Sequence, residues 1–129
     1  MRTSGLIHAD LLAALTALRH TDLFAVSDSG LPTPVGVPVI DLGISYGFPR
    51  FEPILDLILD EVTVEAAWGS SDVAEQNPEA AALLTRCLNA ELIDHDDFKQ
   101  RIGACRFVVR TGEARPYANV LLRAGVPWL

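Results

Sequence analysis

Two short polar stretches near opposite ends of the chain carry the side chains best suited to chemistry. The first contains His20 and, after an apolar run, Asp28; the second contains Tyr117 and Asn119. An imidazole, a carboxylate, a phenol and an amide can hold a ligand rich in hydroxyl groups by hydrogen bonds. The imidazole can also move protons near neutral pH. The types of these residues therefore predict a site for a small polyhydroxylated ligand.

Each of these residues also has an ordinary structural explanation. His20 can be a cation at the end of a helix, where the helix dipole favours positive charge. Asp28 can belong to a turn, and His95 can be a solvated residue on a surface helix. Tyr117 can be a core aromatic residue, and Asn119 can be an amide at a turn or strand edge. Position in the fold has to decide between the two interpretations.

Other kinds of chemistry find less support in the sequence. The three histidines, His8, His20 and His95, lack the i, i+4 spacing that a helical metal site uses. A Gly-x-Ser-x-Gly nucleophile motif does not occur, and neither does a Walker loop or a Gly-x-Gly-x-x-Gly dinucleotide motif. We therefore expect no metal and no cofactor.

The elements that must position these residues follow from apolar periodicity. Leucines at helical spacing predict a helix over 9–19, with His20 at its C-terminal end. The apolar run 23–26 predicts a strand buried on both faces, which places Asp28 at the strand's carboxyl end, where open α/β sheets bind ligands. The further expected elements are a stiff connector over 30–38, a strand over 39–42, a helix over 51–59, a strand over 62–68, a helix from Pro78 to about 92 capped by Asn77, a short helix opened by Asp94, and strands over 107–109 and 119–122 around a turn. This alternation predicts an α/β class with a mixed sheet.

Composition limits the class of protein and its partners. The 129 residues form a single expected domain, 1–129, of which 50% is hydrophobic, and this predicts self-association. A net charge of −7 argues against nucleic acid as a partner. No apolar stretch approaches the roughly 20 residues of a membrane span, and no secretory signal follows Met1. Cys87 and Cys105 form no close-spaced pair, which is typical of reduced thiols. We expect a cytoplasmic protein.

Taken in order, short motifs along the whole chain resemble the D-ribose pyranase family, the sister group of the L-fucose mutarotases. The first and last motifs are together the most specific. Two departures are Arg19, where the resemblance leads us to expect Gly, and an apparently shortened region from about 84 to 94. The matching motifs are His20-Thr21-Asp22, Asp28-x-Gly30-Leu31-Pro32-x-Pro34, Ile40-Asp41, Gly47-x-Pro49-x-Phe51, Val64-Glu65-Ala66-Ala67, His95-x-x-Phe98-Lys99-Gln100, Arg110-x-Gly112-Glu113-x-x-Pro116-Tyr117-Ala118-Asn119 and Ala124-Gly125-Val126.

The resemblance implies roles for individual residues. His20 matches the catalytic proton donor of the family. The residues that match its sugar-binding positions are Asp28, His95, Tyr117, Ala118 and Asn119. The implied fold is a three-layer α/β/α sandwich with a mixed sheet. The implied assembly is a homodecamer of two pentameric rings, with the active site at a subunit boundary.

The implied activity is the interconversion of β-D-ribopyranose and β-D-ribofuranose without a cofactor, which supplies furanose to ribokinase. Two alternatives remain open on the sequence. One is a mutarotase for another sugar such as L-fucose, and the other is a non-catalytic sugar-binding module that assembles into rings. Whether Asp28 or His95 carries the second proton also stays open.

Overall fold

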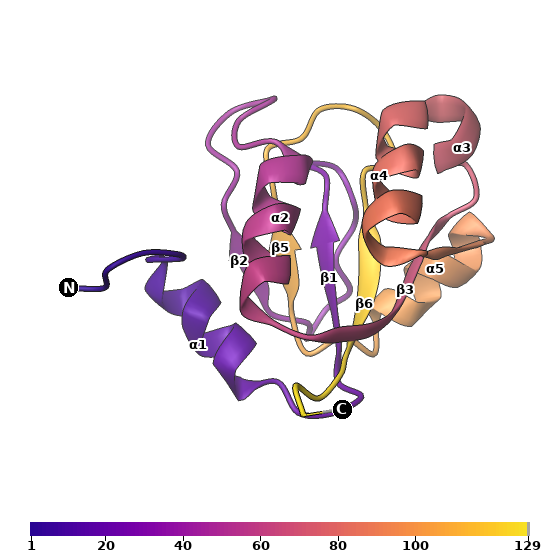
Figure 1. Cartoon of the computed structure of the whole chain (residues 1–129). Coiled ribbons are helices and arrows are strands. Elements are labelled where there is room, and N and C mark those ends of the chain that lie inside the picture. The colour runs from indigo at the N-terminus through magenta and orange to yellow at the C-terminus, as the bar shows by residue number, and fades with distance from the viewer. Residues whose placement is uncertain (129) are drawn as a thin grey trace.

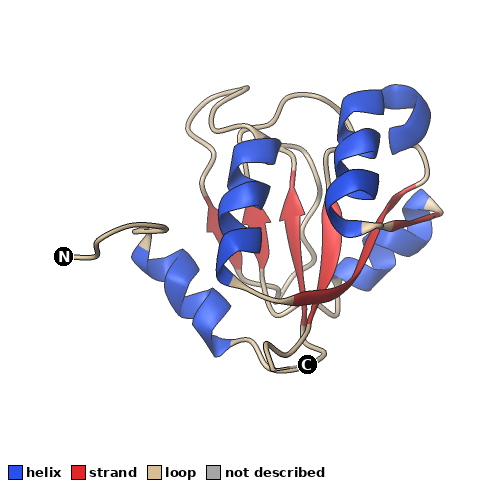
Figure 2. Ribbon diagram, in the orientation of Figure 1, coloured by secondary structure: helices blue, strands red, loops and turns tan. Residues whose placement is uncertain are grey.

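The computed structural model describes residues 1–128. It consists of a six-stranded sheet with helices on both faces (Figures 1 and 2). Strands and helices alternate along most of the chain, as the sequence predicts. In chain order the elements are α1 (Ala9–Ala17), β1 (Leu23–Ser27), β2 (Val39–Asp41), α2 (Phe51–Glu61), β3 (Val64–Ser70), α3 (Val73–Gln76), α4 (Pro78–Leu88), β4 (Glu91–Ile93), α5 (His95–Ile102), β5 (Val108–Arg110) and β6 (Val120–Ala124).

The sheet is mixed because one strand runs against its neighbours. The strand order is β2-β5-β1-β6-β3-β4. β1 and β2 pair parallel with β5, and β3 pairs parallel with β4, whereas β6 pairs antiparallel with both β1 and β3. The carboxyl end of β1 therefore lies beside the amino end of β6. This arrangement brings Asp28 next to Asn119, although 91 positions separate them in the chain.

Two apolar clusters hold helices against the two faces of the sheet. Leu11 of α1, Leu55 of α2 and Leu84 of α4 belong to the cluster on one face. Phe98 and Ile102 of α5 pack in the other cluster, together with Leu31 and Val37 of the connector after β1. Figure 1 shows α2 and α4 on the viewer's side of the sheet and α5 behind it. The predicted three-layer α/β/α sandwich is confirmed.

Helix starts follow the capping chemistry that the sequence predicts. Asn77 Oδ1 accepts a hydrogen bond from the backbone N–H of Ala80 at 3.2 Å, and Pro78 occupies the first helical position of α4. Asp94 Oδ2 accepts from the N–H of Asp96 at 3.1 Å and opens α5. The cap of α5 makes His95 the first residue of the helix, close to the sheet edge.

The prediction that the helix from Pro78 continues to about 92 was wrong. α4 ends at Leu88 because Asn89 adopts a left-handed conformation with φ of 47°, and its N–H donates to the carbonyls of the last turn. The chain then forms the three-residue edge strand β4, which was not predicted. The four-residue helix α3 was missed as well. Elements this short leave little periodicity to detect.

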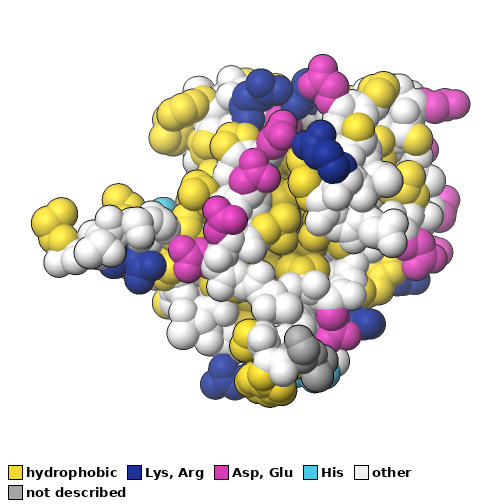
Figure 3. Space-filling view, viewed as in Figure 1, with side chains coloured by type: hydrophobic (Ala, Val, Ile, Leu, Met, Phe, Trp, Pro, Cys, Tyr) yellow, Lys and Arg dark blue, Asp and Glu magenta, His cyan; other side chains and the backbone are white. Residues whose placement is uncertain are grey.

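Several large apolar side chains remain on the surface. The loop between β2 and α2 exposes Ile44, Tyr46 and Phe48, and Trp128 is exposed near the C-terminus. Figure 3 shows hydrophobic side chains gathered over this loop and at the C-terminal end of the molecule. None of the helices within residues 1–128 is long and apolar enough to cross a membrane. The apolar sequence of the C-terminal segment, Val126-Pro127-Trp128-Leu129, predicts that this segment is buried between subunits; Leu129 lies outside the described residues.

Candidate active site

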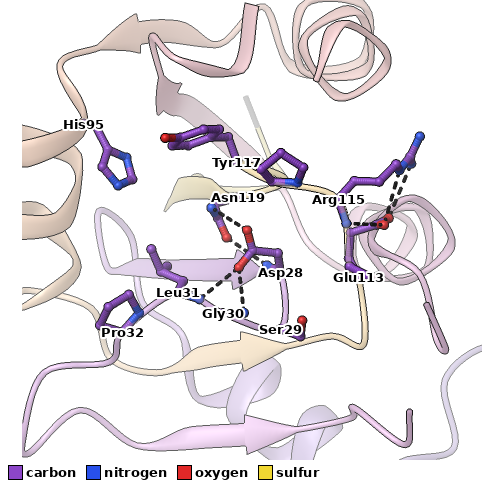
Figure 4. Close-up of a pocket in the computed structure, with 12 residues that line it drawn as sticks. Asp28, Ser29, Gly30, Leu31, Pro32, His95, Glu113, Arg115, Tyr117 and Asn119 are labelled. Atoms are coloured by element: carbon purple, nitrogen blue, oxygen red, sulfur yellow. Dashed lines mark hydrogen bonds and ion pairs between the residues drawn. The ribbon is translucent and has the colours of Figure 1, made fainter. Parts of the chain in front are cut away.

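A cavity of about 280 Å³ lies at the carboxyl end of β1 (Figure 4). This volume is near the lower end of the range for small-molecule sites, roughly 300–1,000 Å³, and suits a ligand of monosaccharide size. The wall combines a buried carboxylate with an imidazole, a phenol and an amide. The cavity is lined by Asp28, Ser29, Gly30, Leu31, Pro32, His95, Glu113, Ala114, Arg115, Pro116, Tyr117 and Asn119.

Asp28 is held at the floor of this cavity by a turn and by an amide. Its Oδ1 accepts from the backbone N–H groups of Gly30 and Leu31, each at 2.9 Å. Burial raises the pKa of Asp28, although these hydrogen bonds and one from Asn119 act in the opposite direction. Asp28 therefore belongs to a turn and also lines the cavity, because the turn orients its carboxylate toward the cavity (Figure 4).

Asn119 fixes Asp28 from the neighbouring strand. Its Oδ1 accepts from the backbone N–H of Asp28 at 2.8 Å, and its Nδ2 donates to Asp28 Oδ2 at 3.3 Å. Only 2% of Asn119 is exposed. Among the described residues Asn119 Nδ2 donates only to Asp28, so its second hydrogen has no protein partner. Asn119 thus serves first as the support of Asp28.

His95 and Tyr117 form the opposite wall of the cavity. Their ring centroids are 5.1 Å apart and nearly perpendicular, at 88°. His95 Nδ1 is hydrogen-bonded to Ser70 Oγ at 3.0 Å, which leaves Nε2 as the ring nitrogen for a ligand. Tyr117 has a left-handed backbone conformation with φ of 57°. This conformation is strained for any residue other than glycine, and such strained residues recur at functional sites. Figure 4 shows both rings across the cavity from Asp28.

Glu113 and Arg115 line one side of the cavity and were not predicted. Burial would raise the pKa of Glu113, but hydrogen bonds from the side chain and N–H of Arg115 and from the N–H of Phe51 lower it overall. In the sequence, Glu113 stands out only as part of the motif that begins at Arg110. The structure pairs it with Arg115, whereas Arg110 pairs with Asp41 at 2.9 Å.

Ala118 was predicted to bind the ligand together with its two neighbours. Its side chain is fully buried and packs in the apolar cluster beneath α2 and α4. A contact from Ala118 to a ligand would have to come from its backbone. That role stays a prediction.

His20 lies at the other end of the sheet. Thr21 N–H donates to the carbonyl of Ala124 at 2.9 Å, so His20 sits beside the amino end of β1 and the carboxyl end of β6. Strand β1 alone, at about 3.3 Å per residue, puts roughly 15 Å between this end and Asp28. His20 Nε2 instead lies 2.5 Å from Oε1 of Glu65. Within one chain, the predicted proton donor and the predicted sugar site are therefore separate.

Known proteins with similar sequences and structures cover nearly the whole chain. The D-ribose pyranase 2 of Streptomyces griseus is 48% identical over 127 residues, which is 98% of each chain. The D-ribose pyranase 1 of Rubrobacter xylanophilus is 46% identical over 99% of this chain and 100% of its own length. The structure of Bacillus subtilis RbsD complexed with D-ribose superposes with a TM-score of 0.95 at 34% identity, covering 99% of this chain and 100% of that one. Residues 1–127 match the RbsD / FucU transport protein family, and the chain belongs to that family.

Proposed function

We propose that this protein is a D-ribose pyranase, which interconverts β-D-ribopyranose and β-D-ribofuranose. The observation that carries the proposal is the cavity in which Asp28, Asn119, His95 and Tyr117 converge. The structural relative in complex with D-ribose supports the choice of sugar, because its backbone matches this one almost throughout. The furanose product is the form that ribokinase would phosphorylate. We place the enzyme in the cytoplasm, a location that its free thiols Cys87 and Cys105 support.

The reaction needs one proton acceptor and one proton donor. When the O1 hydroxyl loses its proton, the electron pair forms the C1=O bond of the aldehyde. The C1–O5 bond breaks, its electron pair goes to O5, and O5 takes a proton from the donor. Closure reverses these steps with O4 in place of O5, so the reaction consumes no net protons. Asp28 and His95 Nε2 are the groups proposed to take the O1 proton. Glu113, the other carboxylate of the lining, is paired with Arg115.

His20 is the proposed donor, and it must come from a second chain. Its side chain is 54% exposed in a single chain, and it lies at the opposite end of the sheet from the cavity. A sugar bound beside Asp28 is out of its reach within that chain. We therefore propose that the His20 end of one subunit packs against the cavity of a neighbour. Each active site would then contain residues of two copies.

The exposed apolar side chains support such an assembly. Ile44 and Tyr46 are exposed and line a second hollow that adjoins the cavity through Ser29. Apolar surface beside a polar site is typical of a buried contact between subunits. We propose a decamer of two pentameric rings. Ten chains of 14.0 kDa give a mass of about 140 kDa, which light scattering would measure.

One exchange experiment tests the proposed activity. Saturation-transfer NMR on D-ribose should show faster exchange between pyranose and furanose signals when the protein is added. His20→Ala should lower this rate by roughly 10²–10⁴-fold, the usual contribution of a general acid. Faster anomer exchange of L-fucose with no effect on ribose would indicate a mutarotase instead. Binding of ribose with no acceleration would indicate a sugar-binding module.

A further inference from the structure

The backbone around His20 is fixed by a closed turn. Asp22 N–H donates to the carbonyl of Arg19 at 3.0 Å, and Asp22 Oδ2 accepts from Arg19 N–H at 2.8 Å. Thr21, inside this turn, has φ of 72°, which is a rare conformation for a β-branched residue. Such a conformation persists only where the surroundings determine it. The turn therefore presents the His20 side chain outward from a defined position.

A single carboxylate then fixes the imidazole ring. Glu65 Oε1 lies 2.5 Å from His20 Nε2, and Nδ1 has no hydrogen-bond partner among residues 1–128. Glu65 sits in β3, where the register with β6 shifts between Val64 and Ala66. Because β3 begins at Val64 opposite Ala124, Glu65 lies at the end of the sheet where His20 lies.

Glu65 is itself held from its second oxygen. Arg123 Nε donates to Oε2 at 3.2 Å, and its terminal nitrogen lies 3.1 Å from the same atom. The Arg123 guanidinium lies over the ring of Trp68 at 5.5 Å. The two oxygens of Glu65 are thus divided, one for the arginine and one for the imidazole. This division leaves Glu65 one preferred orientation, with Oε1 toward His20.

We propose that Glu65 is the positioning residue for proton transfer by His20, and that it makes Nδ1 the nitrogen that delivers the proton. The inference rests on the proposed function, because it assigns a role within that reaction. A carboxylate accepts a hydrogen bond but has none to donate when ionised, so Nε2 must carry a hydrogen. The proton that moves to O5 is then the one on Nδ1. After transfer, the neutral ring keeps its hydrogen on Nε2 and its contact with Glu65.

The alternative is an ordinary surface ion pair. Exposed pairs of this kind contribute little to stability, because water competes and two side chains lose freedom. The side chains of His20 and Glu65 are 54% and 31% exposed, so removal of the pair should leave the fold intact. A purely structural pair and a positioning residue therefore differ in their effect on the rate at saturation rather than on folding.

Glu65→Gln is the test variant, and Glu52→Gln is the matched control. The Gln side chain keeps the size but places an NH2 group where either Arg123 or His20 needs an acceptor. Glu52 forms a surface ion pair with Arg86 at 3.7 Å and lies outside the cavity. Rates are compared at concentrations where light scattering gives the wild-type mass.

We expect Glu65→Gln to lower kcat by roughly 10- to 100-fold with little change in KM, as when a group that orients a functional imidazole is removed. Glu65→Asp, which retains the charge on a shorter arm, should restore part of this loss. Glu52→Gln should match the wild type. In the double variant with His20→Ala, Glu65→Gln should cause no further loss, because its effect passes through His20.

Three outcomes would overturn the inference. They are an unchanged kcat in Glu65→Gln, a rise in KM alone, and a further loss that multiplies with that of His20→Ala. These results are distinct from a failure of the proposed function. If wild-type protein does not accelerate ribose exchange, or His20→Ala is fully active, the reaction or its donor is wrong. If His20→Ala is inactive and Glu65→Gln is not, only the role of Glu65 is wrong.

Discussion

Two inactive variants should restore activity to one another when they share an assembly. His20→Ala removes the proposed donor and leaves the cavity intact, whereas Asp28→Asn damages the cavity and leaves the donor intact. The two groups lie at opposite ends of β1 and cannot serve one sugar within a single chain. In the proposed assembly, each active site would draw its cavity from one copy and the His20 imidazole from another.

The expected recovery follows from this geometry. In a random equimolar assembly, half of the cavities belong to His20→Ala chains and are intact. Half of the neighbours that supply the imidazole are Asp28→Asn chains and carry His20. The product is about one quarter of wild-type activity, whatever the number of subunits in the ring, because each site needs only two chains. A site built within one chain would give no recovery at all.

Co-expression with two different affinity tags would isolate the mixed assemblies. Pyranose–furanose exchange of ribose is then measured by saturation-transfer NMR, per mole of chain. The controls are each variant alone and the two variants combined after separate purification, before subunits can exchange. Mixed assemblies that contain both tags and remain as inactive as the parents would refute the shared site.

Three further predictions concern the cavity and its supports. Asn119→Ala should weaken ribose binding by about 1–3 kcal/mol while kcat changes little, since it removes an amide that would pair with a ribose hydroxyl equally in the ground state and the transition state; unchanged affinity in an NMR titration would mean that the amide serves only the fold. Glu113 has a pKa below its ordinary 4.5, so it stabilises the fold above that value and ceases to do so as pH falls through the folded-state pKa. Glu113→Gln should therefore reduce stability at pH 7 and flatten its acid dependence, and denaturant unfolding at several pH values that found the wild-type slope would contradict this. Gly112→Ala should lower the free energy of unfolding by at least about 1–3 kcal/mol, because the added Cβ would lie 2.2 Å from the carbonyl oxygen of Phe48; an unchanged Tm would show that the loop can move aside.

The sequence by itself determined the class of fold and the main helix starts. Periodic leucines and short apolar runs identify helices and strands, because each element buries one stripe or face. Capping residues such as Asn77 act within a few positions of the chain, so their effect is visible in the sequence. The end of α4 was not predictable in this way. It depends on the left-handed backbone of Asn89 and on the pairing of β4 with β3, a contact with a distant strand.

Tertiary structure alone decided which polar residues meet. Asp28 and Asn119 share hydrogen bonds because β6 runs antiparallel to β1, and strand direction is a property of the assembled sheet. His20 precedes β1 and Asp28 follows it, so they lie at opposite ends of the sheet. The antiparallel pairing of β3 with β6 is what brings Glu65 to the His20 end. Residue types in the sequence indicate which chemistry is available. The order and direction of strands determine where each group acts, because hydrogen bonds reach about 3 Å whereas a strand separates its two ends by several times that distance.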